Sequence, residues 1–320
     1  MSGRPVQTIP AGACGQAAWM IPQPQPNRDL PGLSAQAAST RVFAREVIRR
    51  MRGASQPYLV RCADDLSYVV KFQNNPQHVR VLANEMLAAR LAMLIGLPVA
   101  TPAFVEVPPA LIRGNPPLEL EIGPRRVQCL AGLQFGSRFP GDPGQTLVVD
   151  FLPDRLLSKV RNLASVFLGG FVFDKWTCNC DGRQVIFFRF VDEEIPAYSA
   201  LLIDHGFCFN DGEWSSPDSP IRGLYPRRLV YEKVEGFKSF EPYLSRIENL
   251  ERSRIEECLL DLPEEWCGPE PGQLTRLAEK LYERRRGLRQ AIINAKNSSL
   301  KPFPHWGETE VGGRSRREPC

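Results

Sequence analysis

The alternation of apolar and polar positions predicts strands through the first part of the chain. Residues 58–62 and 68–72 are rich in β-branched and aromatic side chains, and the acidic turn between them is typical of a hairpin. The same pattern predicts further strands at 100–107 and in short stretches within 126–139, while 41–51 fits a strand or a short helix. One helix interrupts this series at 79–95, where apolar side chains recur at helical spacing and are followed by a glycine and a proline.

Helical spacing dominates the second part of the chain. Residues 156–173 form an apolar stretch that predicts a helix, and a polar loop follows at 174–183. Two short apolar strands are expected next, at 185–190 and 198–203. From residue 237 onward the chain should be helical, ending in a clear amphipathic helix over 274–293.

The order of these elements predicts the fold class and its boundaries. Strands first and helices last indicate an α+β, two-lobed fold, with a strand-rich N-lobe at about 40–135 and a helix-rich C-lobe at about 136–295. Residues 1–39 are rich in Pro, Gln, Ala and Gly and lack an apolar period, so they are expected to form a disordered leader. Residues 296–320 are expected to be a disordered tail for a similar reason.

Composition narrows the class of protein. The 320 residues are 43% hydrophobic and 24% charged, an ordinary globular balance, and a net charge of +4 is too small to predict nucleic-acid binding. We see no secretory signal and no apolar run long enough to span a membrane. Nine scattered cysteines without a Cys-x-x-Cys pair, with only three histidines, argue against a zinc site and a disulfide framework. We therefore expect a cytoplasmic protein without nucleic-acid or membrane partners.

Lys71 and Glu85 are the first candidates for chemistry. Lys71 ends a strand of Val and Tyr side chains, where a lysine either faces water, the more common case, or needs an anionic partner. Glu85 lies among apolar neighbours in the following helix, so it either belongs to the outer stripe or is paired inward. A strand lysine followed by a helix glutamate is the pair with which phosphotransferases hold the α- and β-phosphates of ATP.

Two acidic segments lie farther along the chain. The polar loop at 173–184 contains two aspartates, an asparagine and a glutamine between apolar elements, and such a cluster is costly unless it binds something. An aspartate that takes a hydroxyl proton and amide oxygens that hold a divalent ion are the groups a catalytic loop needs. Asp204 ends an apolar strand before a His-Gly pair, which would direct its carboxylate into a cleft; capping of a turn is the alternative.

The order of the lysine, the glutamate, the aspartate loop and the Asp-x-Gly strand is that of the kinase fold. Phe-Asp-Lys-Trp-Thr-Cys-Asn-Cys-Asp-Gly-Arg-Gln at 173–184 and Ile-Asp-His-Gly-Phe at 203–207 make the chain resemble the HipA-like kinase family. The resemblance is to its bacterial branch with an FDxWxxNxDxRQ loop and an IDHGF strand. It covers residues 53–293, and the chain is more distantly similar to HipA toxin kinases and phosphatidylinositol 4-kinases.

The resemblance implies a nucleotide site. ATP would be the bound nucleotide, Lys71 would hold its α- and β-phosphates, and Glu85 would orient Lys71. The adenine-binding hinge would lie near residues 130–135, with Leu133 and Gln134 as candidates. The loop that covers the phosphates through its backbone N–H groups would consist of Gly53, Ala54, Ser55 and Gln56.

The resemblance also implies catalytic and metal-binding residues. Asp181 would be the catalytic aspartate, and Asp204 would bind Mg²⁺. Kinases usually carry a metal-binding asparagine about five residues after the catalytic aspartate. Ile186 stands there and cannot bind metal, so we expect the amide oxygen of Gln184 to take this place.

Three hypotheses about function follow. The first is an ATP- and Mg²⁺-dependent phosphotransferase that acts on a hydroxyl group, such as a Ser or Thr of a protein. The second is a nucleotide-binding pseudokinase that serves as a regulatory interaction module. The third is a kinase for a lipid head group or a small molecule, against which the chain shows no basic amphipathic surface. The position of Gln184 distinguishes the first two hypotheses: a side chain that reaches a metal favours an active kinase, and one that points into the core favours nucleotide binding without transfer.

Overall fold

The computed structural model describes residues 40–192, 197–217 and 219–307, and all structural statements below concern these residues. The predicted leader at 1–39 lies outside the described residues, as do the last thirteen positions of the predicted tail, 308–320.

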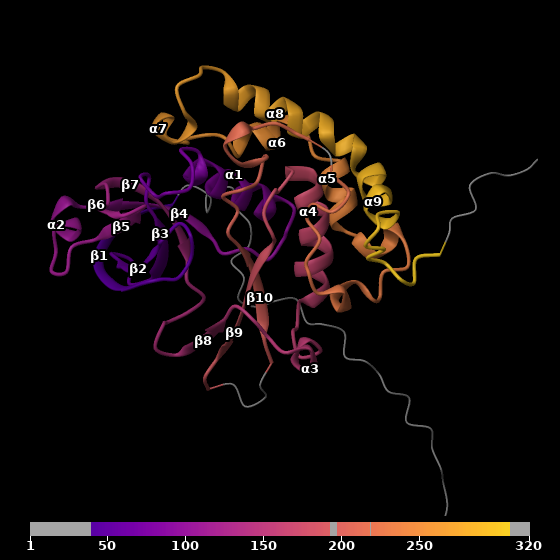
Figure 1. Cartoon of the computed structure of the whole chain (residues 1–320), viewed down its shortest axis with the longest axis horizontal. Coiled ribbons are helices and arrows are strands. Elements are labelled where there is room, and N and C mark those ends of the chain that lie inside the picture. The colour runs from indigo at the N-terminus through magenta and orange to yellow at the C-terminus, as the bar shows by residue number, and fades with distance from the viewer. Residues whose placement is uncertain (1–39, 193–196, 218, 308–320) are drawn as a thin grey trace, which may run out of the picture. The chain divides into compact units, whose positions relative to one another are not determined.

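Five strands close into a barrel in the order β1-β2-β3-β7-β4 (Figure 1). Neighbouring strands run antiparallel except for β1 and β4, which pair in parallel and close the barrel. The predicted hairpin is present, and the strand alternative for residues 41–51 is confirmed. The five strands are β1 (Arg41–Arg50), β2 (Tyr58–Cys62), β3 (Ser67–Lys71), β4 (Pro102–Val107) and β7 (Gly132–Arg138).

The predicted helix at 79–95 is α1 (Val81–Leu94), and it is buried along most of its length. Burial explains why its apolar residues do not keep to one stripe, since a helix enclosed by protein has no solvated face. The amide nitrogen of Asn84 lies 2.8–3.0 Å from the carbonyl oxygens of Gly206, Cys208 and Asp211. These bonds fix α1 to the segment that carries the Asp-His-Gly sequence.

Two smaller sheets complete the strands. One has the order β10-β9-β8, with β8 (Thr146–Val149), β9 (Gln184–Phe190) and β10 (Ser199–Ile203), and the other is the hairpin of β5 (Glu119–Ile122) and β6 (Arg125–Gln128). Strand β10 is joined to the chain that follows α1, because Leu202 N–H donates to the carbonyl of Pro98 at 2.9 Å. The end of β10 is thereby held beside α1.

Most helices lie in the second part of the chain, where α4 packs against α5, α8 and α9 (Figure 1). The order of strands and helices agrees with the predicted α+β class, while the division into two lobes remains a prediction. The helices besides α1 are α2 (Pro109–Ile112), α3 (Asp154–Leu157), α4 (Gly170–Thr177), α5 (Tyr243–Glu248), α6 (Arg252–Glu257), α7 (Glu264–Cys267), α8 (Gln273–Arg284) and α9 (Leu288–Lys296).

The single helix predicted over 156–173 is wrong in two respects. It is interrupted after α3, and a π-helical turn at Ser165–Gly169 leads into α4. Gly169 permits this packing, because a Cβ there would lie 2.5 Å from Leu97. The helix also continues through Thr177, so Asp174 lies on a buried helix and not in the predicted loop. Likewise the helix predicted at 274–293 is divided by a 3₁₀ turn at Arg285–Gly287.

The packed chain extends past the predicted boundary at residue 295. Phe303 and Trp306 are only 4% and 9% exposed, and both rings contact Phe240 at centroid distances of 5.6 and 6.0 Å. Lys296 also donates to the carbonyl of Gly307 at 2.8 Å. The predicted tail is therefore corrected for residues 296–307. Isolated aromatic side chains between prolines have no period, which is why the sequence pattern missed them.

The helices and cysteines add two observations. Within the described ranges, no helix is both long enough and apolar enough to cross a membrane. The described cysteines are free thiols, and all of them except the partly exposed Cys180 are buried, as small apolar side chains usually are.

Candidate active site

Lys71 lies at the centre of a buried cluster of charges. Its ammonium group donates to the carboxylates of Glu85 on α1 and of Asp204 after β10, the second at 2.7 Å. The side chains of Lys71 and Glu85 are 9% and 3% exposed, and that of Asp204 is 21% exposed. Lys71 therefore has anionic partners and does not face water, and Glu85 is paired inward.

Burial and pairing have opposite effects on the pKa values of this cluster. Burial disfavours the Lys71 cation, but Glu85 and Asp204 outweigh burial and raise the pKa of Lys71. Burial raises the pKa of Glu85, although Lys71 and the His205 amide, 3.0 Å from Oε2, oppose this rise. Burial also disfavours ionised Asp204, yet Lys71 holds the pKa of Asp204 below its ordinary value. With both carboxylates ionised, the cluster carries one excess negative charge, which a divalent cation can balance.

A cavity lies beside this cluster, and six of the predicted site residues line it. Its wall comes from the loop after β1, from β3, α1, β7, β9 and β10, and from the turn after β10. The predicted site residues that line it are Gly53, Ser55, Lys71, Glu85, Gln184 and Asp204. In the described part of the chain, those that do not line it are Ala54, Gln56, Leu133, Gln134 and Asp181.

The wall contributed by β7 differs from the predicted hinge. Gln134 is fully buried, and its amide accepts from the N–H of Gln73 at 2.8 Å and donates to the carbonyl of Leu130 at 3.1 Å. Its side chain thus braces the barrel. The residues of this wall that face the cavity are Phe135 and the adjoining segment at 137–140.

The loop between β1 and β2 is a tight turn. Gln56 N–H donates to the carbonyl of Gly53 at 3.0 Å, and Gly53 has a φ of 130°, which only glycine adopts readily. The backbone N–H groups of Ala54 and Ser55 make no hydrogen bond within the described residues. Successive unpaired N–H groups in such a turn are suited to bind an anion.

Asp181 lies in the exposed loop between α4 and β9. Its carboxylate accepts from the N–H of Gly182 at 2.7 Å, and its own N–H lies 3.3 Å from the side-chain oxygen of Asn179. These local bonds shape the loop and leave the Asp181 side chain at the surface. The N–H of Cys180 donates to the carbonyl of Phe207 at 3.1 Å, so the loop is attached to the segment after Asp204.

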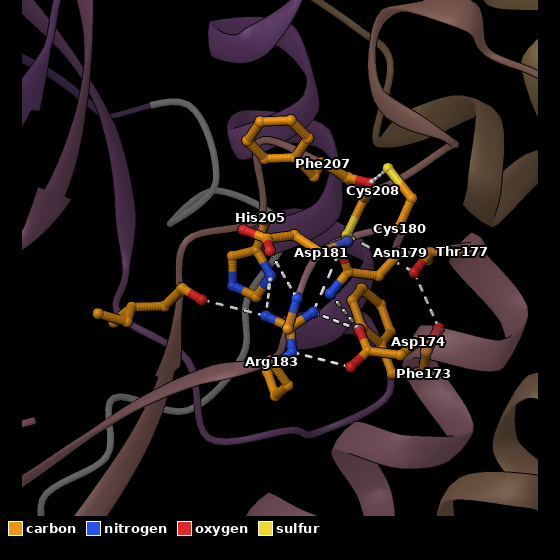
Figure 2. Close-up of polar contacts among 12 residues, drawn as sticks. Phe173, Asp174, Thr177, Asn179, Cys180, Asp181, Arg183, His205, Phe207 and Cys208 are labelled. Atoms are coloured by element: carbon orange, nitrogen blue, oxygen red, sulfur yellow. Dashed lines mark hydrogen bonds and ion pairs between the residues drawn. The ribbon is translucent and has the colours of Figure 1, made fainter. Parts of the chain in front are cut away.

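Arg183 joins α4, through Asp174, to the segment after β10, through His205 (Figure 2). Its Nε donates to Asp174 at 2.9 Å, and a second nitrogen, Nη2, binds the other carboxylate oxygen. Its Nη1 lies 3.1 Å from both the carbonyl of Ile203 and Nδ1 of His205. A guanidinium can only donate, so Nδ1 is an acceptor. Burial and Arg183 lower the pKa of His205 well below its ordinary value, and its ring is neutral.

The Asp174–Arg183 pair is a buried structural element that the sequence did not reveal. The two side chains are 0% and 2% exposed. Both residues were included in the polar loop, but neither was given a role. One signal was available: an aspartate directly after the apolar stretch ending at Phe173 requires a buried cation if that stretch is a core helix. The pair fixes the start of β9 and the end of β10 relative to α4.

The oxygen groups at the cavity fit Mg²⁺ that arrives with a phosphate ligand. Among the described residues there is no group of three or more His, Cys, Asp or Glu side chains that could hold a metal alone. Asp204 and the exposed Gln184 both line the cavity and supply a carboxylate and an amide oxygen. Mg²⁺ is usually held by one or two carboxylates together with water and substrate phosphates, and the carboxylate of Asp204 is a ligand of this kind.

Comparison with known proteins gives one extensive match. A family model described as HipA-like kinase matches residues 44–294. No curated protein matches the chain significantly.

Several solved kinase structures are similar at low identity. A Golgi casein kinase has 14% identity and a TM-score of 0.48, covering 83% of this chain and 76% of that one. The Golgi casein kinase with Mn/ADP bound has 13% identity and a TM-score of 0.46, with the same coverage. The Helicobacter pylori proinflammatory kinase CtkA has 14% identity and a TM-score of 0.49, covering 81% of this chain and 99% of that one.

Proposed function

This chain belongs to the HipA-like kinase family, and on that premise we propose that it is an ATP- and Mg²⁺-dependent kinase that phosphorylates a hydroxyl group. The acceptor that we propose is a serine or threonine of a protein. The observation that carries the proposal is the convergence of Lys71, Glu85 and Asp204 at one cavity. A kinase needs three such groups together: a lysine that binds the phosphates, a glutamate that orients the lysine, and an aspartate that binds the metal.

The nucleotide would occupy the cavity with its base among apolar side chains. Val69 of β3, Ile186 of β9 and Leu202 of β10 line it and offer surfaces for a flat ring. The phosphates would extend toward Lys71 and the free N–H groups of the loop at 51–57. In this arrangement the cavity wall formed by Phe135 and residues 137–140 would serve as the hinge, which shares Phe135 with the stretch at 130–135 that the sequence predicted. The barrel with α1 and the helical part would then act as the two lobes.

Asp204 and Gln184 would hold Mg²⁺, which supplies charge neutralisation for the phosphates. Lys71 now binds Asp204, so this ammonium is already next to the position of the metal and the phosphates. When the phosphates enter, Lys71 exchanges one carboxylate for phosphate oxygens and keeps Glu85 as its partner.

Asp181 would accept the proton of the acceptor hydroxyl at its carboxylate. Its exposure suits this role, since the acceptor must approach from solvent while the nucleotide fills the cavity. Proton acceptance by a positioned carboxylate contributes typically 10²–10⁴-fold, roughly, to such reactions. Arg183 and Asn179 fix the loop that presents it.

The pseudokinase alternative depends on Gln184. That residue is exposed and lines the cavity, and a side chain in the core would have favoured binding without transfer. Its position supports an active enzyme.

ATP turnover by the purified protein, with and without Mg²⁺, tests the proposal. Asp204→Asn should lose Mg²⁺-dependent ATP binding, while Asp181→Asn should bind Mg-ATP like the parent and transfer at least about 100-fold more slowly. Asp65→Asn is the matched control, because Asp65 has a φ of 61° beside 57° for Asp204 but lies at the surface. If both site variants bound and turned over ATP like this control, the kinase assignment would be wrong.

A further inference from the structure

The side chain of Gln56 pairs with the backbone of the β5–β6 hairpin. Its Nε2 donates to the carbonyl of Glu121 at 2.8 Å, and its Oε1 accepts from the N–H of Glu121 at 2.7 Å. An adjacent strand would make the same pair of bonds, so Gln56 occupies the outer edge of β5. The loop at 51–57 and the hairpin are far apart in sequence, and this amide joins them.

Residues on both sides of Gln56 reinforce the junction. Arg50, at the end of β1, donates to the carboxylate of Glu121 at 3.2 Å and also to Oε1 of Gln56. The hydroxyl of Tyr58, at the start of β2, donates to the carbonyl of Glu119 at 2.8 Å and accepts from its N–H at 3.2 Å. The loop is therefore tied to β5 at its beginning, at Gln56 and at its end.

The backbone of the loop explains why it requires such anchoring. Gln56 has a φ of 50°, a left-handed conformation that is unfavourable for a residue with a side chain. It persists where surrounding contacts determine it, and the amide bonds to Glu121 are such contacts. Gly53 and Ser55 of the same loop line the cavity, whereas Gln56 faces the hairpin.

The hairpin has its own anchor to the barrel at its other end. The amide of Asn74, just after β3, donates to the carbonyl of Gln128 at 2.9 Å and accepts from the N–H of Leu130 at 3.1 Å. A two-stranded hairpin alone is marginally stable, so these contacts make it a fixed support.

We propose that Gln56 is a positioning residue that sets the affinity for the triphosphate by fastening the phosphate loop to the β5–β6 hairpin. The inference rests on the proposed function and changes the role of Gln56 from phosphate contact to support. Its backbone closes the turn, and its side chain bonds away from the cavity. The N–H groups of Ala54 and Ser55, which the turn leaves free, are then held in place for the phosphates.

The test compares ATP with adenosine, because only ATP reaches the loop. Isothermal titration calorimetry of the full chain would measure Mg-ATP and adenosine binding to the parent, to Gln56→Met and to Gln128→Met. Methionine has a similar length to glutamine and makes neither amide bond. In the described residues the side chain of Gln128 forms no hydrogen bond, which makes it the control. Hydrogen exchange of the amide at position 56, which donates to Gly53, in nucleotide-free protein is the second measurement.

Gln56→Met should bind Mg-ATP about tenfold more weakly than the parent, because it loses the two amide bonds to Glu121 and the bond from Arg50 that together order the loop. Adenosine affinity should stay within about twofold, and exchange of the amide at position 56 should accelerate at least about fivefold. Unchanged ATP affinity, or equal weakening for ATP and adenosine, would overturn the proposal.

The measurements also separate this inference from the proposed function. If the parent protein bound neither ATP nor adenosine, the proposed function would fail. Faster exchange of the amide at position 56 in Gln56→Met would then still support Gln56 as the residue that holds the loop. Unchanged exchange would remove that role as well.

Discussion

Arg183→Met should destabilise the fold strongly, because it leaves a buried carboxylate without its cation. The Asp174 side chain is 0% exposed, and its one remaining donor among the described residues would be the neutral amide of Asn179, at 3.2 Å. Breaking a buried ion pair by removing one member costs roughly 3–5 kcal/mol of the free energy of unfolding. The carbonyl of Ile203 and Nδ1 of His205 would lose their donor too, so we expect the upper part of this range.

Urea unfolding followed by tryptophan fluorescence measures this change, since Trp176 and Trp266 are buried in the core. Asp174→Asn should cost a similar amount, and the double variant should cost less than the sum of the two, with a coupling free energy of about 0.5–3 kcal/mol. Arg252→Met is the control: Arg252 pairs with Glu256 at the surface, and its loss should change stability little.

The same variant has a functional readout. Arg183 holds the carbonyl of Ile203, the residue before Asp204, so folded Arg183→Met should bind Mg-ATP more weakly than the parent. An unfolding free energy within about 1 kcal/mol of the parent would show that Asp174 is not an uncompensated buried charge, and the role given to this pair would be refuted.

Three further predictions concern pH, backbone geometry and the C-terminal packing. Because the ring of His205 is neutral, the free energy of unfolding should decrease as the pH falls below 6.5, by up to about 1.4 kcal/mol per pH unit, since the unfolded chain takes up a proton that the folded chain excludes. In urea titrations from pH 7 to 5, the stability of His205→Asn should depend less on pH, and equal slopes for variant and parent would contradict a neutral ring. Gly223→Ala should lower the free energy of unfolding by about 1–3 kcal/mol, since Gly223 has a φ of 78° and a Cβ there would lie 2.6 Å from the side chain of Asp174. Gly182→Ala is the control, because a Cβ there would meet open space, and it should leave thermal unfolding unchanged. Phe303→Ala should lower the free energy of unfolding by about 3–5 kcal/mol in the same assay. The control Leu300→Ala, at a residue that is 37% exposed, should lower it by less than about 1 kcal/mol. If Phe303→Ala cost no more than this control, residues 296–307 would belong to the tail as predicted from the sequence.

Local periodicity in the sequence was enough to predict the elements whose structure depends mainly on neighbouring residues. The hairpin of β2 and β3, the helix α1 and the strands β9 and β10 were all predicted within a few residues. Each has a regular apolar period and a turn or stop residue at its end, so short-range geometry is sufficient to identify it. The short strands β5 and β8 have no such pattern and were not identified individually.

The site residues were recognisable for a different reason. Lys71 and Asp204 are charged residues at the ends of apolar strands, and Glu85 is a carboxylate on an apolar helix. Such placements are costly without a partner, so the sequence marked these groups as candidates for pairing, beside the alternatives of a water-facing lysine and a turn-capping aspartate. The inward pairing of Lys71 with Glu85 and Asp204 is the arrangement that this cost requires.

Tertiary structure alone decided which distant groups satisfy one another. The parallel closure of β1 with β4, the pairing of Asp174 with Arg183 and the contact of Gln56 with Glu121 all depend on surfaces that no local pattern specifies. The packing of Phe303 against Phe240 is of the same kind. A residue's own sequence neighbours set its backbone preference, but the partner of a buried polar or aromatic group is set by the whole fold, because many residues could supply it and only packing selects one.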